Sequence, residues 1–521
     1  MTKPPDMSRA ARLTAFAAML LGTLLASIEA TIVATAMQDI VDDLGGREIF
    51  SWAFSAYILA STVTVPLYGK LADLFGRRRV YAAGIALFVG GSALCGAAPT
   101  MPLLIVARAV QGLGAGAIIP LTMTVTGDLF EVRERARLQG LFAVVWGISS
   151  VVGPLAGAWV TAASSWRWIF YLNVPFSVLS VTLLALTLRE PPARRHVRVD
   201  WAGAALLFAG ASALLVALLP AAQRAALGPL WPWAAGGVAG LAAFVWHERR
   251  TPEPIAPLGL LRDPVQAAAN AAGFLLGVCM FAQITFTPLY IEKVLGLRAI
   301  DAGQALIPVS LGWSVASFAA GRALVRLGYR PVVRAGALAV LAGSVGVSLR
   351  VGLGWAPLFV PALALFGLGM GACITSFTVA VQDRVEHERR GVATALTVFS
   401  RSMGGAVGTS VMGAALAWAV AGRPASALGW GVAGLFWATA AAAAGAAAVV
   451  WVLFPRAAVR AADAADADAE TDAGAETAAD ADAETHAGDQ AGAGARASDD
   501  ATAEGGASVA PPGPVRHASR T

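Results

Sequence analysis

Charged residues are scarce in this chain. Only 14% of its 521 residues are Asp, Glu, Lys or Arg, whereas 57% are hydrophobic. A water-soluble domain carries about a quarter charged residues. This deficit excludes an ordinary soluble globular core.

Residue types that bind metals or carry out nucleophilic chemistry are also few. Cys95, Cys279 and Cys373 lie in apolar runs, and we expect them to pack rather than to form disulfides or bind metal. The five histidines form no cluster, which argues against a metal site. No GxxxxGKS or GxxxxGKT motif occurs, so an ATP-driven pump is unsupported. Because no metal cluster or nucleophile–base pair stands in the body of the chain, we predict that it is not an enzyme.

What the chain has instead is a series of long apolar runs. A helix needs about 20 predominantly apolar residues to cross a bilayer. Fourteen segments qualify, and an even number places both termini on one side of the membrane. The predicted spans are residues 13–37, 51–71, 80–98, 102–125, 138–161, 171–189, 201–221, 229–246, 267–291, 302–323, 332–350, 356–380, 391–419 and 429–454.

The loops between these segments predict the orientation. On one face they carry clusters of Lys and Arg, and on the other only isolated cations such as Arg47 and Arg350. Cytoplasmic loops carry the excess of Lys and Arg in membrane proteins. We therefore predict a multi-pass protein of the plasma membrane with both termini cytoplasmic. Its basic charge reports orientation in the lipid bilayer rather than a nucleic-acid partner. The clustered cations include Lys70, Arg77–Arg79, Arg249, Arg250, Arg384, Arg389 and Arg390.

The two ends of the body match when the chain is shifted by about 250 residues, so that Gly69 and Gly76 fall on Gly321 and Gly328. We predict an all-α membrane protein with 14 transmembrane helices, in which two parallel six-helix bundles flank two extra helices. Transporters use this plan and hold substrate between the halves. The predicted divisions are a cytoplasmic N-terminus (1–12), a first bundle (13–189), a linker with the two extra helices (190–266), a second bundle (267–454) and a disordered, acidic, Ala-rich cytoplasmic tail (455–521).

Comparison of the two halves separates scaffold from chemistry. Glycines kept in both halves are expected to allow close approach of helices. Polar residues that occur in one half only are candidates for function. Glu29, Asp73, Arg108 and Gln111 overlay Met280, Val325, Leu363 and Phe366, whereas Arg401 overlays Trp146.

Short motifs then point to a family. They are IEATIVATAM at 28–37, GKLADLFGRRR at 69–79, RAVQGLGAG at 108–116, GISSVVGPLAG at 147–157 and WRWIFYLNVPF at 166–176. Through them the body, about residues 12–455, resembles the major facilitator superfamily, and more narrowly the 14-helix drug:proton antiporters of the EmrB/QacA type. The first motif departs from the family pattern, which usually has Asp at the position of Glu29 and often Pro at that of Gln38.

The resemblance implies proton-coupled efflux of amphipathic drugs or antibiotics by alternating access. It also implies that the proton gradient supplies the energy, that no cofactor is needed and that the protein functions as a monomer. The alternative is a dedicated exporter of one metabolite, such as a self-made antibiotic or siderophore. Import by symport is disfavoured by the motif at 147–157, and a receptor that only binds would not need Glu29.

Glu29 is the sharpest candidate for coupling protons to substrate. A carboxylate inside a membrane helix is costly unless it faces the bundle interior, pairs or takes up a proton. A helical rise of about 1.5 Å per residue places Glu29 and Arg108 at similar depth on antiparallel helices, where they can touch or share a ligand. With Gln111 they form the predicted coupling site. A cationic substrate would compete there directly with the proton, and a neutral one indirectly.

The motif at 69–79 predicts a gate on the cytoplasmic face. The resemblance implies that Asp73 and Arg77 act with Asp128 to hold the two halves together while the cavity faces outward. Asp73 is also expected to face the amino end of the helix that begins near Arg390, where the helix dipole favours an anion. The predicted gate residues are Gly69, Asp73, Gly76, Arg77 and Asp128.

Two further groups of residues complete the candidates. The helix-5 motif consists of Gly147, Gly153, Pro154 and Gly157, for which bland packing is nearly as good an explanation as a specific role against leak. Arg401 lies at membrane depth, where arginine is usually functional, although backbone carbonyls could also pair with it. For aromatic residues on helices, a core or lipid-facing position is the commoner alternative to a cavity wall. The candidate cavity residues are Trp146, Phe281, Gln283, Phe286, Tyr290 and Arg401.

Overall fold

The computed structural model describes residues 7–188, 199–217, 228–252, 254–353, 358–424 and 427–455. The chain divides into two units, Met1–Val459 and Arg460–Thr521, and all the described helices belong to the first. Beyond residue 455 the predicted tail lies outside the described residues, as do residues 1–6. Every regular element in the described part of the chain is helical.

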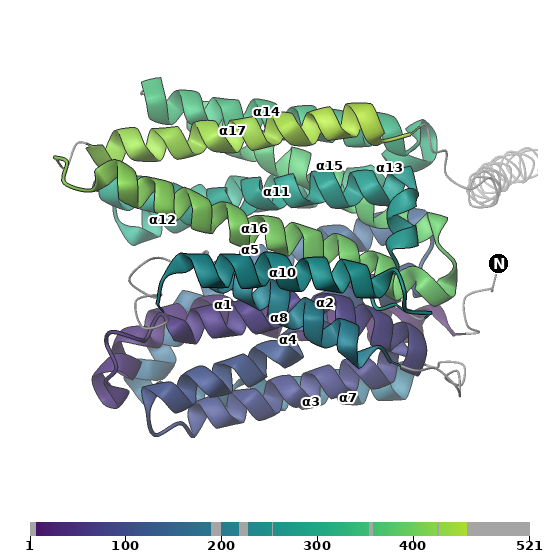
Figure 1. The fold of residues 1–521 in the computed structure, drawn as a ribbon, viewed down its shortest axis with the longest axis horizontal. Helices are drawn as coiled ribbons and strands as arrows, with labels where there is room; N and C mark the ends of the chain where they lie inside the picture. Colours follow the sequence, from purple (N-terminus) through teal and green to yellow (C-terminus); the bar gives the residue numbers. More distant parts are fainter. Residues whose placement is uncertain are drawn as a thin grey trace, which may run out of the picture. The chain divides into compact units, whose positions relative to one another are not determined.

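The first group of helices runs from α1 to α7 (Figure 1). Gly76 separates α2 from α3 with a φ of 93°, a left-handed conformation that glycine adopts without steric cost. Gly328 separates α13 from α14 with a φ of 77°. The turn chemistry therefore recurs where the sequence repeat places it. The bounds are α1 (Arg9–Leu44), α2 (Trp52–Phe75), α3 (Arg77–Gly96), α4 (Met101–Leu129), α5 (Val132–Ala163), α6 (Trp168–Tyr171) and α7 (Asn173–Thr187).

The second group runs from α11 to α17, and a hairpin of two helices stands between the groups along the chain. The hairpin consists of α8 (Trp201–Ala217) and α10 (Leu230–Glu248). The later elements are the 3-10 helix η2 (Leu258–Arg262), α11 (Pro264–Leu289), the π-helical turn η3 (Tyr290–Val294), α12 (Ala299–Ala305), α13 (Ile307–Leu327), α14 (Tyr329–Leu353), α15 (Phe359–Arg384), the 3-10 turn η5 (His387–Arg389), α16 (Arg390–Val420) and α17 (Ala427–Leu453).

Each of the predicted spans corresponds to one of these helices or helix pairs, with two differences in detail. The span predicted at 302–323 begins inside α12. The helix is interrupted at Leu306, and α13 then starts with Pro308 in its first turn. The span predicted at 171–189 is preceded by the short helix α6. Among the described residues, ten helices are long and apolar enough to cross a membrane.

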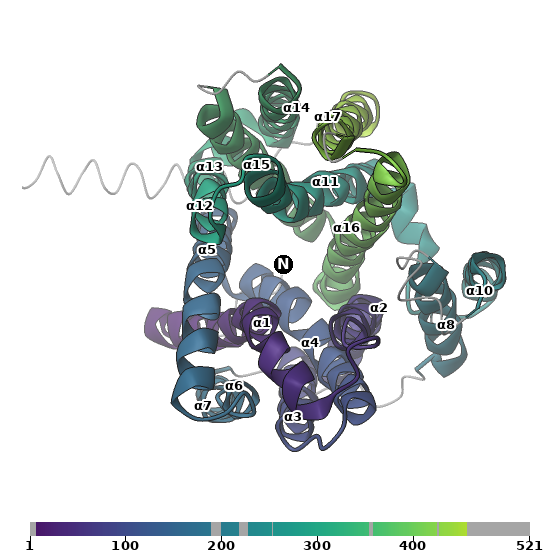
Figure 2. The same cartoon turned by 90° about the vertical axis from the view of Figure 1, so that its left-hand side faces the viewer.

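The helices pack most closely within their own half. In the first half α4 packs on α2 and α3 while α1 packs on α5, and in the second half α15 packs on α13 and α14 while α11 packs on α16. The largest contacts between the halves are those of α5 with α13 and of α2 with α16, and smaller ones join α4 to α15 and α16 and α5 to α15. Figure 2 shows the two groups facing each other, with α8 and α10 to one side. The residue boundaries that we drew for the two bundles stay predictions.

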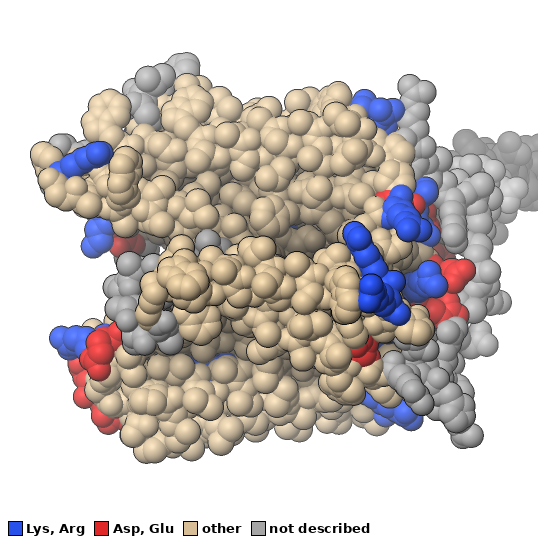
Figure 3. Space-filling model, viewed as in Figure 1, with Lys and Arg blue, Asp and Glu red and all other residues tan. Residues whose placement is uncertain are grey.

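Lys and Arg gather at one end of the helices, as Figure 3 shows on the face in view. We call this end, which carries Arg77–Arg79 and Arg389–Arg390, the arginine-rich end. It lies where α2 meets α3 and where α15 meets α16. The opposite end carries smaller groups of charges, such as Asp43 with Arg167 and Arg298 with Asp301.

Candidate functional site

Glu29 of α1 and Arg108 of α4 form an ion pair inside the first half. Arg108 Nη1 lies 2.5 Å from Glu29 Oε1, and the two residues are 0% and 1% exposed. Arg108 Nε donates to the carbonyl of Ala53 at 3.2 Å, and its guanidinium lies 4.2 Å from the ring centroid of Tyr57. The helical rise predicted that Glu29 and Arg108 lie at similar depth, and the structure shows that they are in direct contact.

The second oxygen of Glu29 has its own donor, which the sequence did not single out. Asn173 Nδ2, at the start of α7, donates to Glu29 Oε2 at 2.6 Å and to Ser92 Oγ at 3.0 Å. Gln111 Nε2 donates to the same Ser92 Oγ at 3.2 Å. The signal for Asn173 was present, because it stands inside the motif WRWIFYLNVPF. Four helices thus converge on one buried carboxylate.

The network can accommodate either charge state of Glu29. Arg108 Nη1 also donates to Gln111 Oε1 at 2.7 Å, so it keeps an acceptor if Glu29 takes up a proton. Asn173 keeps Ser92 in the same way. A buried donor that loses its acceptor costs about 1–3 kcal/mol. The second acceptors remove this cost, which suits a group that binds and releases a proton.

The first residues of the motif at 166–176 form contacts at the end of this half that lies opposite the arginine-rich end. Arg167 Nη1 lies 2.6 Å from Asp43 Oδ2, and Trp166 Nε1 donates to the same oxygen at 3.0 Å. Arg167 also donates to the carbonyl of Ala98 at 3.3 Å. Because this pair is partly exposed to solvent, it is worth little on its own. The pair links the end of α1 to the segment that precedes Asn173.

At the arginine-rich end, Asp73 caps a helix of the other half. Asp73, near the end of α2, accepts from the backbone N–H groups of Gly391 at 3.0 Å and of Val392 at 2.8 Å. These groups are the first free donors of α16, where the helix dipole favours a negative charge. The structure thus places Asp73 at the helix end near Arg390 that the sequence indicated.

Two arginines extend this contact into a chain of charges. Arg77 lies 3.1 Å from Asp73 and 3.1 Å from Asp128, both in the first half. Arg390 of α16 lies 2.8 Å from Asp128 and donates to the carbonyl of Gly127 at 3.1 Å. All four side chains are at least four-fifths buried. Arg390, which the sequence prediction mentioned only as a neighbour, therefore joins the predicted gate residues by direct contact.

A third contact between the halves involves an amide. Gln382 of α15 donates to the carbonyl of Met123 on α4 at 3.0 Å and to Thr394 of α16 at 3.1 Å. Gln382 is 1% exposed. The sequence analysis did not identify Gln382, because the recognised motifs all lie in the first half and Gln382 belongs to the second.

Gly69 lets the two halves touch. A Cβ at Gly69 would collide with Ala395 Cβ and would lie 2.8 Å from the carbonyl oxygen of Gly391. Both partners belong to α16. The close approach expected for this glycine is therefore an approach between the halves, at the contact that Asp73 caps.

The glycines of the helix-5 motif lie at helix contacts. Cβ atoms at Gly153 and Gly157 would collide with the hydroxyls of Thr31 and Thr35 on α1, while one at Gly147 would lie 3.2 Å from Ser310 Cβ on α13. α5 is thus held against helices of both halves by small residues. The side chain of Pro154 lies outside the described residues. This geometry supports close packing and leaves a role against leak untested.

The candidate cavity residues fall into two groups. The structure places Gln283, Phe286 and Tyr290 in the packed core of the second half, with exposed fractions of 1%, 4% and 3%. At these exposed fractions they present almost no accessible surface in this conformation. Trp146 is 42% exposed, and Phe281 and Arg401 are partly exposed.

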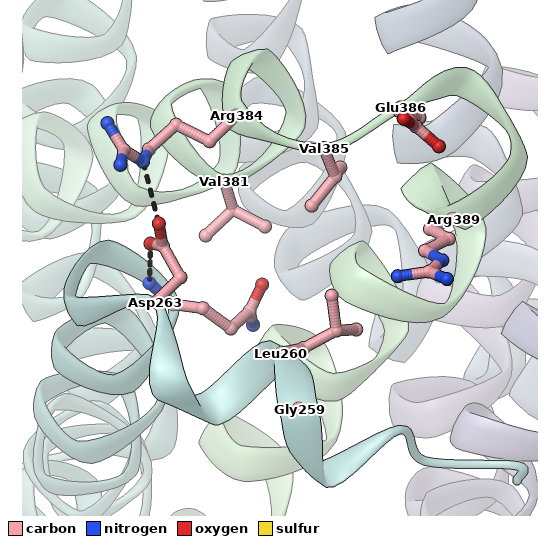
Figure 4. Close-up of a pocket in the computed structure, with 9 residues that line it drawn as sticks. Gly259, Leu260, Asp263, Val381, Arg384, Val385, Glu386 and Arg389 are labelled. Atoms are coloured by element: carbon pink, nitrogen blue, oxygen red, sulfur yellow. Dashed lines mark hydrogen bonds and ion pairs between the residues drawn. The ribbon is translucent and has the colours of Figure 1, made fainter.

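The structure adds a pocket of about 320 Å³ at the arginine-rich end that the sequence did not indicate (Figure 4). Arg384 and Asp263, 2.9 Å apart, form one side, and Leu260 lies on another (Figure 4). The buried amide oxygen of Gln266, which also lines it, has no hydrogen-bond partner within the described residues. The two arginines of the wall, Arg384 and Arg389, are matched by two acids, so the pocket favours no charge sign.

A buried ion pair in apolar helices, two packed halves and a network of charges between them are features of a membrane transporter. The family model described as "Major Facilitator Superfamily" matches residues 19–409. The "Multidrug transporter protein MdtP" of Bacillus subtilis (strain 168) is 35% identical over 405 residues, which cover 76% of this chain and 74% of that protein. The "Multidrug resistance protein 3" of the same organism is 34% identical over 409 residues, covering 76% and 78%. The chain belongs to the Major Facilitator Superfamily.

Solved structures agree on the fold. The proton:xylose symporter XylE gives a TM-score of 0.61 at 15% identity, with 86% of this chain and 97% of that chain covered. The human organic anion transporter MFSD10 (TETRAN) gives a TM-score of 0.59 at 16% identity, with 85% and 100% covered. At these identities the likeness concerns the fold alone.

Proposed function

We propose that this protein exports amphipathic drugs or antibiotics across the plasma membrane in exchange for protons, by alternating access. The observation that carries the proposal is the ion pair of Glu29 with Arg108, buried in the first half and braced by Asn173. A carboxylate at such a depth marks a proton or substrate path. The names of the similar bacterial proteins support drugs as the cargo.

In the proposed cycle Glu29 holds the proton and the gate sets which side has access. The contacts of Asp73, Arg77, Asp128 and Arg390 close the arginine-rich end, which we take as cytoplasmic by the positive-inside rule. In the proposed cycle the opposite, outer end gives access while these contacts are closed. A proton that enters there and binds Glu29 weakens its hold on Arg108 and favours the reverse conformation. Both termini are then cytoplasmic, and one chain suffices.

The proton gradient supplies enough energy for such export. One proton moving inward yields about 2.3 kcal/mol per 100 mV of membrane potential. A difference of one pH unit adds about 1.4 kcal/mol. Together these sustain a concentration ratio of a few hundred for one exchanged substrate molecule. No nucleotide is required.

The test is Glu29→Gln in the full chain reconstituted into liposomes. We expect proton-driven export of toxic amphiphiles to be lost while expression and substrate binding persist. Unchanged proton-driven export would overturn the role of Glu29. A panel of drugs tested for resistance with and without an uncoupler separates broad drug export from export of a single metabolite.

A further inference from the structure

Arg401 carries a charge that its surroundings leave uncompensated. Among the described residues its side chain makes no hydrogen bond or ion pair, in contrast to Arg108 and Arg390. It stands 11 residues after the start of α16, which is about 16 Å along the helix. An unpaired cation at this depth is costly, and such residues mark the paths of substrates and ions.

The helices around Arg401 contain no acid at its level. α16 contacts α2, α4, α11, α15 and α17, and its middle also packs against α8. Of these helices α8, α11, α16 and α17 contain no Asp or Glu at all. The acids of the other three are Asp73, Asp128 and Asp383, which lie at the arginine-rich end, about three turns from Arg401. The helix α10, which shares a hydrophobic cluster with Phe399 of α16, adds only Glu248, its last residue.

Other helices cover several sides of α16 around Arg401. α11 covers one side of α16, because a Cβ at Gly277 would collide with the carbonyl of Arg401. α2 covers a second side near Ala395, and α8 covers a third through Met403. Arg401 lies seven residues, two helical turns, after Thr394, which accepts a hydrogen bond from Gln382 of α15. It therefore shares the face of α16 that turns toward the interior.

The carboxylate of Glu29 does not balance this charge. Both its oxygens are engaged within the first half, by Arg108 and by Asn173, and the residue is fully buried. The charge of Arg401 therefore produces a positive potential in surroundings of low polarity, where it acts strongly on an anion. A cationic substrate would meet repulsion from Arg401 and no free acid.

The walls near Arg401 are apolar. The ring of Phe281 lies against Gly405, one helical turn beyond Arg401 on the same side of α16. An aromatic body would pack on this ring while a negative group pairs with the guanidinium.

We propose that Arg401 anchors the substrate and that the site takes amphipathic organic anions, with an aromatic body and a carboxylate, sulfonate or phosphate group. This assignment rests on the export function proposed above and gives it a substrate class. It reverses the charge sign expected from Glu29 alone, because Glu29 is already neutralised by its partners.

Binding to the purified full chain in lipid nanodiscs tests this assignment with two dyes. Fluorescein and rhodamine 123 share a xanthene body and carry opposite charges. We expect the wild type to bind fluorescein more tightly. Arg401→Gln should weaken fluorescein binding by about tenfold or more, the usual effect of losing a charge-assisted hydrogen bond. Arg401→Lys should retain most of the affinity.

Arg350→Gln is the matched control, because it removes the same net charge from a residue that bonds to Tyr290 on the far side of the second half. It should leave fluorescein binding unchanged. Unfolding temperatures of all variants are compared in the same nanodiscs. If Arg401→Gln does not fold, displacement of fluorescein from the wild type by sulfonate competitors, and not by cationic ones, gives the same answer.

Three results would overturn the assignment: fluorescein affinity that Arg401→Gln leaves unchanged, tighter binding of rhodamine 123 than of fluorescein by the wild type, and no binding of fluorescein or of a naphthalene sulfonate.

The failure of this assignment can be distinguished from the failure of the export proposal. If anion binding depends on Arg401 but no proton gradient drives transport, the exchange mechanism fails and the site stands. If protons drive the export of rhodamine 123 and Arg401→Gln does not change it, the exchange mechanism stands and the anion site fails.

Discussion

Asn173 on α7 donates a hydrogen bond of 2.6 Å to Glu29 Oε2, the carboxylate oxygen that Arg108 leaves free. The arginine comes from α4 and the amide from α7, so two helices hold opposite oxygens of a group on α1. Movement of either helix changes the stability of the charged carboxylate. Glu29 is thereby linked mechanically to the packing of its own half.

Asn173→Ala should shift the pH dependence of transport toward alkaline pH. The charged form of Glu29 loses a donor worth about 1.5–3 kcal/mol, whereas the protonated form loses less. We expect a shift of about one pH unit in the profile of export rate, measured in liposomes over a series of internal pH values. A mere packing defect would lower the rate at every pH without moving the profile.

Ser177→Ala provides the control for Asn173→Ala. Ser177 is a fully buried residue one turn along α7, and its hydroxyl has no hydrogen-bond partner within the described residues. Its loss should leave the pH profile in place. An equal displacement in both variants would refute the specific role of Asn173.

Helix positions and the main functional pair could be predicted from the sequence because both depend on local signals. Apolar runs mark the helices, and a lone acid and a lone arginine stand out inside them. Gly69 and Asp73 were found through their motif, and the structure adds what they touch. These contacts join α2 to α16, more than 300 residues away.

What could not be predicted depends on which way a helix turns. Phe286 and Tyr290 were cavity candidates, and the structure places both in the core of the second half. When a helix is apolar on all sides, periodicity does not show which face is buried, because the core, a cavity and the lipid all accept aromatic residues. Gln382 was missed because it lies in none of the recognised motifs, and Asn173 was missed because its motif was read as a family signature and not for its polar residue.

Asp73→Asn should slow transport while leaving substrate binding intact. The substitution removes the negative charge that caps α16 and pairs with Arg77, so the closed form of the gate is less stable. The loss of about 1–2 kcal/mol corresponds to a decrease of roughly five- to thirtyfold in the population of the closed gate. Initial export rates and equilibrium binding of the same substrate are the measurements. Arg79→Gln, at an exposed position in the first turn of α3, should behave as the wild type, and full activity of Asp73→Asn would refute the latch.

Gly69→Ala should prevent the gate from closing. The added methyl group would collide with Ala395 and with the backbone of Gly391, which cannot move away without displacing α16. We expect transport to fall by at least tenfold, with the arginine-rich end becoming more accessible to membrane-impermeant thiol reagents at a cysteine introduced for Thr394. Overpacking of this kind costs about 1–3 kcal/mol. Gly90→Ala on α3 is the control, because its Cβ would meet nothing within 4 Å. Equal activity of the two variants would contradict the proposed contact.

Glu29→Asp separates the charge of the coupling residue from its reach. Aspartate keeps the carboxylate but shortens it by one methylene, so it cannot contact Arg108 and Asn173 together as Glu29 does. Loss of one hydrogen bond to the charged carboxylate costs about 1.5–3 kcal/mol, even though the donor keeps its second acceptor. We therefore expect Glu29→Asp to retain proton-dependent export at about a tenth of the wild-type rate, whereas Glu29→Gln loses the dependence on protons. Export and proton release are measured together in pH-sensitive liposomes. Wild-type rates in Glu29→Asp would show that only the charge matters, and that the contact with Asn173 contributes nothing to coupling.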